Sequence, residues 1–221
     1  MVNAAVTDPR EAERRLAIGY APLAARPALA ALLALDARLG AVVAGTREPM
    51  VGQMRLTWWH EALSRLDVAP PPAEPVLTAL AAEVLPIGIA GAELAPMIDG
   101  WEALLDPEID EERALLHAQA RGSNLFCLAA RALGAVTAAP SQAGEGWALA
   151  DLALRLSDAK ARQRARELAA ERLDAAFGRR WPAPLRPLGA LALLARADLV
   201  GTPAGSPRRI GRLAWHRLTG R

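Results

Sequence analysis

Apolar residues recur along most of the chain at the three- and four-residue spacing of an amphipathic helix. Leu56, Trp59, Leu63 and Leu66 show this most clearly, because all four would lie on one face of a helix. No run of residues alternates between apolar and polar positions as a half-buried strand does. The pattern therefore predicts an all-α protein built as a single helical bundle.

Capping residues and prolines divide this pattern into elements. Asp8 is predicted as an N-cap, with Pro9 at the first helical position and Glu11 closing a capping box. A second such start is predicted at Asp106 and Pro107. The predicted helices are 9–20, 27–44, 49–66, 75–85, 92–105, 107–133, 146–177, 184–197 and 207–218. A proline-rich loop, a small-residue loop and a short linker separate some of them, at 68–75, 137–146 and 202–207.

Composition supports the helical prediction. The chain has 221 residues, of which 51 are Ala, against 10 Val and 6 Ile. Alanine is the best helix former, whereas β-branched residues favour strands. Since 52% of the residues are hydrophobic, the chain can bury a sizeable core. We predict one helical domain over 1–201, followed by a basic segment over 202–221.

Charge is distributed unevenly along the chain. The formal net charge is only +2, yet residues 179–221 hold nine Arg and one acid. The last fifteen residues, 207–221, have five Arg and no acid, with Ile210, Leu213 and Leu218 at helical spacing. This segment fits a helix on an anionic membrane surface or an acidic protein partner. It equally fits a final helix that docks its apolar stripe on the bundle. No nucleic-acid partner is expected.

Several classes of site are excluded by composition. A single cysteine, Cys127, rules out an intrachain disulfide and a CxxC site, and three scattered histidines argue against zinc. No charge-free run reaches the length of about 20 residues that spans a bilayer. The N-terminus lacks a basic start followed by an apolar block. We therefore expect a cytoplasmic protein, with attachment to the periphery of the inner membrane left open.

Three segments together resemble a known family. The first is Tyr20–Leu63, which contains the segments ALLALD (31–36) and RLTWWHEAL (55–63). The second is the small-residue segment 121–134, and the third is GWALADLALR, at 146–155. Their order over residues 8–200 resembles the squalene/phytoene synthase family.

The resemblance implies the all-α isoprenoid synthase fold, with helices around a central cavity. Enzymes of this family join two isoprenoid diphosphates head to head, and carry DxxxD motifs on two facing helices. The chemistry explains these carboxylates, because they hold Mg²⁺ ions that neutralise the departing diphosphate.

The chain departs from this pattern at both motifs. At the first, Asp36 is the only carboxylate and Gly40 stands four residues later. At the second, Leu156 stands where the family has an aspartate, between Asp151 and Asp158. With Arg155 between them, these two aspartates are predicted to form a surface ladder of ion pairs rather than a metal site. The one literal DxxxD, over 106–110, is predicted to cap a helix.

Candidate site residues follow from the resemblance and from side-chain chemistry. If the protein is active, the catalytic candidates are Asp36, Asp151 and Asp158. The candidates for substrate binding are Arg55, Trp58, Trp59, Arg155 and Arg162. The arginines suit bidentate contacts with diphosphate oxygens. Adjacent tryptophans on a helix point about 100° apart, so one is expected to pack inward and the other to line a groove. No metal or other cofactor is expected, with Mg²⁺ required only if the protein is active.

Two functions follow. The first is a non-catalytic protein near a membrane, which acts as a scaffold or assembly factor or binds an isoprenoid or lipid. The family includes a mitochondrial respiratory complex I assembly factor with similarly degraded motifs, which favours this function. The alternative is an active head-to-head prenyltransferase with atypical metal ligands.

Overall fold

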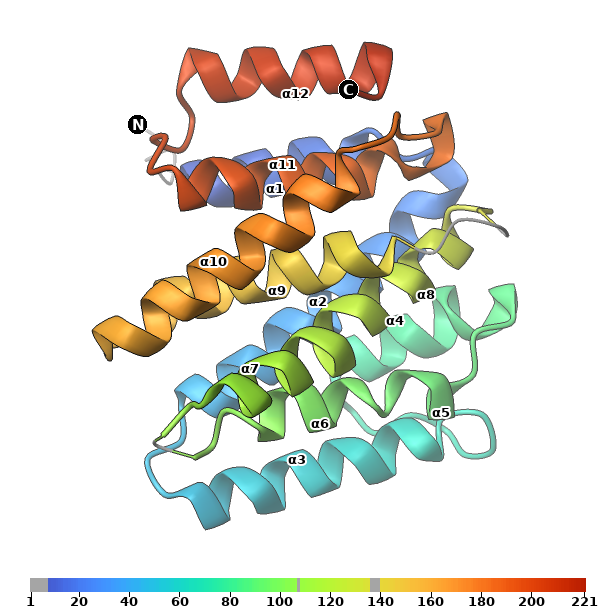
Figure 1. The fold of residues 1–221 in the computed structure, drawn as a ribbon. Coiled ribbons are helices and arrows are strands. Elements are labelled where there is room, and N and C mark those ends of the chain that lie inside the picture. Colours follow the sequence, from blue (N-terminus) through green and yellow to red (C-terminus); the bar gives the residue numbers. More distant parts are fainter. Residues whose placement is uncertain (1–7, 107, 136–139) are drawn as a thin grey trace, which may run out of the picture.

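A computed structural model describes residues 8–106, 108–135 and 140–221, and every regular element in these residues is a helix (Figure 1). The α-helices are α1 (Pro9–Gly19), α2 (Arg26–Ala44), α3 (Pro49–Ser64), α4 (Pro75–Glu83), α5 (Gly91–Leu94), α6 (Met97–Glu102), α7 (Glu111–His117), α8 (Asn124–Ala132), α9 (Ser141–Arg155), α10 (Ala159–Ala176), α11 (Arg186–Leu199) and α12 (Pro207–Thr219). A π-helical turn, Ala118–Ser123, joins α7 to α8. Short 3₁₀ turns lie at Leu23–Ala25, Leu85–Ile87 and Ala183–Leu185. The all-α prediction is confirmed.

The first helix begins where its capping signal predicts. The Asp8 carboxylate accepts a hydrogen bond from the Arg10 backbone N–H at 3.0 Å, and α1 starts at Pro9. Glu11, however, does not close a capping box. Its carboxylate accepts from the Arg15 side chain instead, at 2.9 Å.

The predicted long helix 146–177 is wrong, because it is two helices. It starts earlier, at Ser141, and breaks after Arg155, where Leu156 adopts an extended backbone (ψ 129°). Asp158 then caps α10, its carboxylate accepting from the Ala161 N–H at 2.8 Å. A short polar side chain that bonds the backbone competes with helix continuation, which explains the break.

Two other helix boundaries also differ from prediction. The segment 92–105 is split into α5 and α6 around Pro96, which lacks the N–H that a continuous helix would use. The helix predicted from Pro107 begins at Glu111, with Asp110 as its N-cap. Position 107 itself lies outside the described residues. Asp106 accepts from the Glu108 N–H at 3.0 Å, ahead of the helix.

The core lies around α2 and α9, which run through the middle of the bundle (Figure 1). The segment Leu23–Ala44, which includes α2, is apolar and long enough to span a membrane, and half of its most apolar stretch is buried inside the bundle. The helix α9 lies in backbone contact with the π-helical turn, because a Cβ added at Gly122 would lie 2.1 Å from the Gly144 carbonyl oxygen. This close approach brings the side chains of α9 and of the turn together.

The last helix, α12, packs along α11 (Figure 1). Its docked face consists of Arg209, Leu213 and His216, all buried. Of the apolar stripe predicted from the sequence, Leu213 is buried, but Ile210 and Leu218 are exposed. The division of the chain at 201/202 stays a prediction.

Candidate functional site

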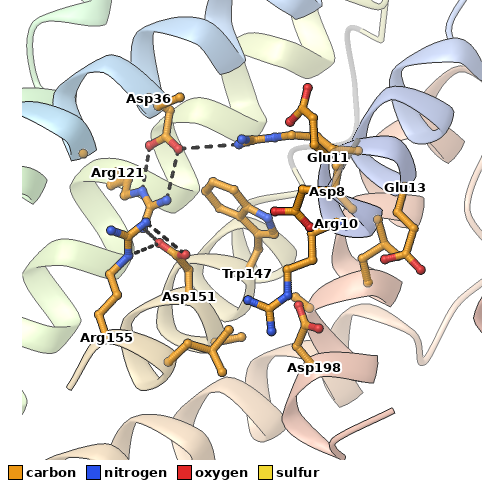
Figure 2. Close-up of a pocket in the computed structure, with 18 of the residues that line it drawn as sticks. Asp8, Arg10, Glu11, Glu13, Asp36, Arg121, Trp147, Asp151, Arg155 and Asp198 are labelled. Carbon is orange, nitrogen blue, oxygen red and sulfur yellow. Dashed lines mark hydrogen bonds and ion pairs between the residues drawn. The ribbon is translucent and has the colours of Figure 1, made fainter. Parts of the chain in front are cut away.

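A cavity of about 510 Å³ opens between α1, α2, α9 and α11 (Figure 2). One part of its wall is charged, with Asp36, Asp151 and Arg155 among the lining residues. Another part is apolar, with Trp147, Leu154 and Leu191. Since ligand cavities are commonly of this size and mixed character, it is the candidate site of the molecule.

Arg121, from the π-helical turn, lies between Asp36 and Asp151 (Figure 2). Its Nε and one terminal nitrogen donate to both oxygens of Asp36, at 2.7 and 3.0 Å. Its other terminal nitrogen donates to Asp151 Oδ2 at 2.7 Å. A buried guanidinium therefore bridges the carboxylates of α2 and α9.

His117 and two tryptophans fix the position of that guanidinium. Because arginine can only donate, His117 Nε2 accepts from Arg121 at 3.0 Å, and His117 Nδ1–H donates to the Gly100 carbonyl oxygen at 2.6 Å. Burial, together with the neighbouring Arg121 charge, lowers the pKa of His117 to about 3. The rings of Trp101 and Trp147 lie 4.1 and 4.6 Å from the guanidinium carbon, which is the geometry of cation–π contacts.

Positive charge exceeds negative charge around the aspartate pair. Arg155 donates to Asp151 at 3.1 Å, and Arg14 lies 3.9 Å from Asp36. Burial would raise the pKa of Asp151, but Arg121 and Arg155 outweigh it and lower that pKa to about 2. Burial likewise opposes the charge of Arg121, yet Asp36 and Asp151 raise its pKa above the ordinary value. Asp151 and Arg121 therefore both stay charged at neutral pH.

Trp101 fills the space in which the second carboxylate of the first DxxxD motif would lie. A Cβ added at Gly40 would meet the Trp101 ring at 2.7 Å. The Trp101 Nε1–H also donates to Asp36 Oδ1 at 3.3 Å. An aspartate at position 40 would require this buried ring to move.

The residues present do not fit a Mg²⁺ cluster. In the described part of the chain, no three His, Cys, Asp or Glu side chains gather as a metal-binding group. Both oxygens of Asp36 already accept hydrogen bonds from Arg121, and Asp151 Oδ2 also accepts one from it. A cation that needs several carboxylate oxygens finds them occupied by a protein cation.

Some of the predicted site residues are brought together. Asp36, Asp151 and Arg155 all line the cavity. Asp158 does not, because it caps α10 beyond the break in the helix. The predicted ladder from Asp151 through Arg155 to Asp158 is therefore wrong in its second half. Arg162 is exposed on α10 and donates to the Leu156 carbonyl oxygen at 3.2 Å, outside the cavity lining.

The three candidates on α3 lie elsewhere. Trp59 is 3% exposed and Trp58 is 45% exposed, so the prediction that one of the two packs inward is confirmed. The exposed Trp58 lines a separate groove with Arg55, and Trp59 also contributes to that groove. The Arg55 guanidinium donates to Thr46 Oγ1 at 3.2 Å. None of the three lines the central cavity.

The sequence reasoning missed the centre of the site. Neither Arg121 nor His117 is among the site residues predicted from the sequence. A signal was present, because His117 and Arg121 are four residues apart and would share one face of a helix, and residues 114–144 contain no acidic residue. If Arg121 is buried, its counter-charge must therefore come from another helix.

Comparison with known proteins identifies the family. The family model described as squalene/phytoene synthase matches residues 10–187. No significant match was found among curated proteins or among solved structures. The match covers most of the chain, and it agrees with the helical fold around a cavity to which α2 and α9 each contribute an aspartate. The chain therefore belongs to the squalene/phytoene synthase family.

Proposed function

We propose that this protein is a non-catalytic member of its family, in which Arg121 takes the place of the catalytic metal ions. It acts as a scaffold or assembly-type protein, and its cavity accepts an isoprenoid or lipid chain. The observation that carries the proposal is the bridge from Asp36 through Arg121 to Asp151.

The geometry of the guanidinium supports a structural role. Four of its five N–H groups are engaged, by Asp36, Asp151 and His117, and two indole rings lie against it. Little donor capacity remains for a diphosphate. A metal ion, by contrast, keeps coordination positions open for the leaving group. Arg121 therefore neutralises the aspartates without supplying the electrophile that ionises a prenyl diphosphate.

The apolar wall of the cavity supports binding of a chain-like ligand. Trp147, Leu154, Leu191 and Leu194 form a surface on which an isoprenoid could pack. Arg155, 45% exposed at the rim, offers one cation to a polar head group. Arg10 and Arg14 also line the cavity, but so do the carboxylates of Asp8, Glu11 and Asp198. This mixed charge beside an apolar wall suits a lipid with a small head group better than a magnesium diphosphate.

One observation favours the alternative, an active prenyltransferase. Asp36 and Asp151 do converge from two facing helices, as catalytic aspartates would (Figure 2). Activity would require Arg121 to leave both carboxylates, although only 2% of its side chain is exposed. It would also have to proceed without Asp158.

Diphosphate release tests the proposal. The full-length protein is incubated with farnesyl or geranylgeranyl diphosphate and Mg²⁺, and released diphosphate and extracted hydrocarbons are measured. We expect no more than a heat-denatured control gives. Mg²⁺-dependent release of diphosphate that is lost in Asp36→Asn would overturn the proposal and establish the alternative.

A further inference from the structure

The orientation of α12 is fixed by three buried side chains, and this defines its outer face. Arg209, 3% exposed, pairs with Glu13 of α1 and with Asp198 of α11, each at 2.7 Å. His216 packs edge-on against the Trp181 ring, and the backbone N–H of Trp181 donates to the Gly220 carbonyl oxygen at 2.8 Å. Because these contacts lie on one side of the helix, the opposite side faces away from the bundle.

That outer face carries large apolar side chains. Trp215 is 60% exposed and Leu218 is 75% exposed, and Ala214, one turn before Leu218, is exposed beside them. Ile210 stands at the edge of the same face, 38% exposed. Several exposed apolar side chains on one helix mark a surface that meets an apolar phase or a partner.

Arginines flank this apolar face on both sides. Arg208 and Arg212, one turn apart, lie along one side, and Arg217 lies on the other, where its guanidinium is 5.0 Å from the Tyr20 ring. Within the described residues, none of these three forms an ion pair with a carboxylate. Their charges are therefore available to an external anion.

A groove of about 380 Å³ runs beside the Arg208 edge, between α11 and α12. Leu193 and Val200 contribute apolar surface to it, and Arg196, Arg208 and Arg212 contribute cations. This combination is complementary to an anionic phospholipid. The apolar surface can contact the acyl chain, and the guanidiniums can bind the phosphate.

We propose that α12 is a peripheral membrane helix that lies in the plane of an anionic lipid surface, with Trp215 and Leu218 inserted among the lipids. The exposed arginines then meet lipid phosphates, with Arg208 and Arg212 placed at the groove. A helix with an apolar face between basic edges binds in this manner, and its attraction to anionic lipid is weakened by salt. This inference does not depend on whether the central cavity is catalytic.

Vesicle co-sedimentation of the full-length protein tests the proposal. The vesicles are phosphatidylcholine alone, or phosphatidylcholine and phosphatidylglycerol in equal parts, at low and at high salt. Two variants change the helix, R208Q/R212Q and W215S/L218S. Their matched controls are R47Q/R65Q, with the same change in charge, and M50S/M54S, which removes exposed apolar side chains of α3. Figure 1 shows α3 on the opposite side of the bundle from α12.

We expect the wild type to bind the anionic vesicles, with binding reduced by high salt and weak on neutral vesicles. Each α12 variant should bind about tenfold more weakly or worse, whereas both controls should bind as the wild type does. All substituted side chains are exposed, and a thermal melt verifies that each variant is folded. Equal binding to neutral and anionic vesicles, or equal losses in the control variants, would overturn the proposal. So would absence of binding by the wild type, which would instead point to an acidic protein surface.

Discussion

Replacement of Arg121 by methionine tests the central cation directly. Methionine keeps an unbranched, flexible side chain between Trp101 and Trp147 but removes the charge and every donor. Asp36 would then lose two hydrogen bonds and retain only the Trp101 N–H and the distant Arg14. The variant therefore leaves a buried carboxylate without its counter-ion.

The expected loss of stability is large. Removing one partner of a buried ion pair costs about 3–5 kcal/mol. The total stability of a domain is only about 5–15 kcal/mol. For a chain of this size, 1 kcal/mol corresponds to about 2–4 °C in Tm, so the melting temperature should fall by about 6–20 °C.

Thermal unfolding followed by circular dichroism measures the effect. The control is R164M, because Arg164 pairs with Glu111 at 2.8 Å on the exposed surface, and it should change Tm far less. The triple variant R121M/D36N/D151N should recover part of the loss, since it removes the uncompensated charges as well. If R121M melts no lower than R164M, the bridge does not stabilise the fold and the reasoning is refuted.

Three further predictions concern the same cluster. In R121M the freed carboxylates should bind Mg²⁺, so millimolar Mg²⁺ should raise the Tm of this variant and not that of the wild type; an equal rise in both would contradict this. The pKa of His117 is lowered to about 3 in the folded protein, so the unfolded chain binds a proton near pH 6.5 and the folded protein does not. The free energy of unfolding should therefore decrease as the pH falls from 6.5 to 3. Because the pKa of Asp151 is lowered to about 2, the free energy of unfolding should decrease further as the pH falls below 4. Urea unfolding at several pH values measures both effects, and H117Q should remove only the decrease between pH 6.5 and 4. G40A should lower stability by about 1–3 kcal/mol in urea unfolding, since its Cβ would meet Trp101 at 2.7 Å, and an unchanged midpoint would show that the ring moves freely.

Local signals in the sequence predicted local structure well. The cap at Asp8 and the helix start at Pro9 depend on adjacent residues only, and so do the starts of α3, α4 and α12 at prolines. The break at Leu156 was missed because apolar spacing continues across it. There, one backbone hydrogen bond of Asp158 decides between one helix and two.

The site depends on contacts between distant parts of the chain. Asp36 and Arg121 are 85 residues apart in the sequence, and Asp151 is 30 residues from Arg121. Arg121 reaches Asp151 because Gly122 allows α9 to approach the π-helical turn. Periodicity identifies which face of a helix is apolar but not which partner covers it. For the same reason the apolar stripe of Ile210, Leu213 and Leu218 does not identify the docked face of α12: with Arg209 paired to Glu13, Leu213 is buried while Ile210 and Leu218 are exposed.

Mn²⁺ binding to the wild-type protein tests the account most directly, because Mn²⁺ replaces Mg²⁺ in carboxylate sites and its EPR signal separates free from bound ion. The measurement compares titrations of the wild type and of Asp36→Asn at neutral pH. Because Arg121 lies between Asp36 and Asp151, we expect the two proteins to give the same titration, with no saturable Mn²⁺ site that depends on Asp36. Saturable Mn²⁺ binding by the wild type that Asp36→Asn abolishes would show that metal displaces the guanidinium, and would contradict the account.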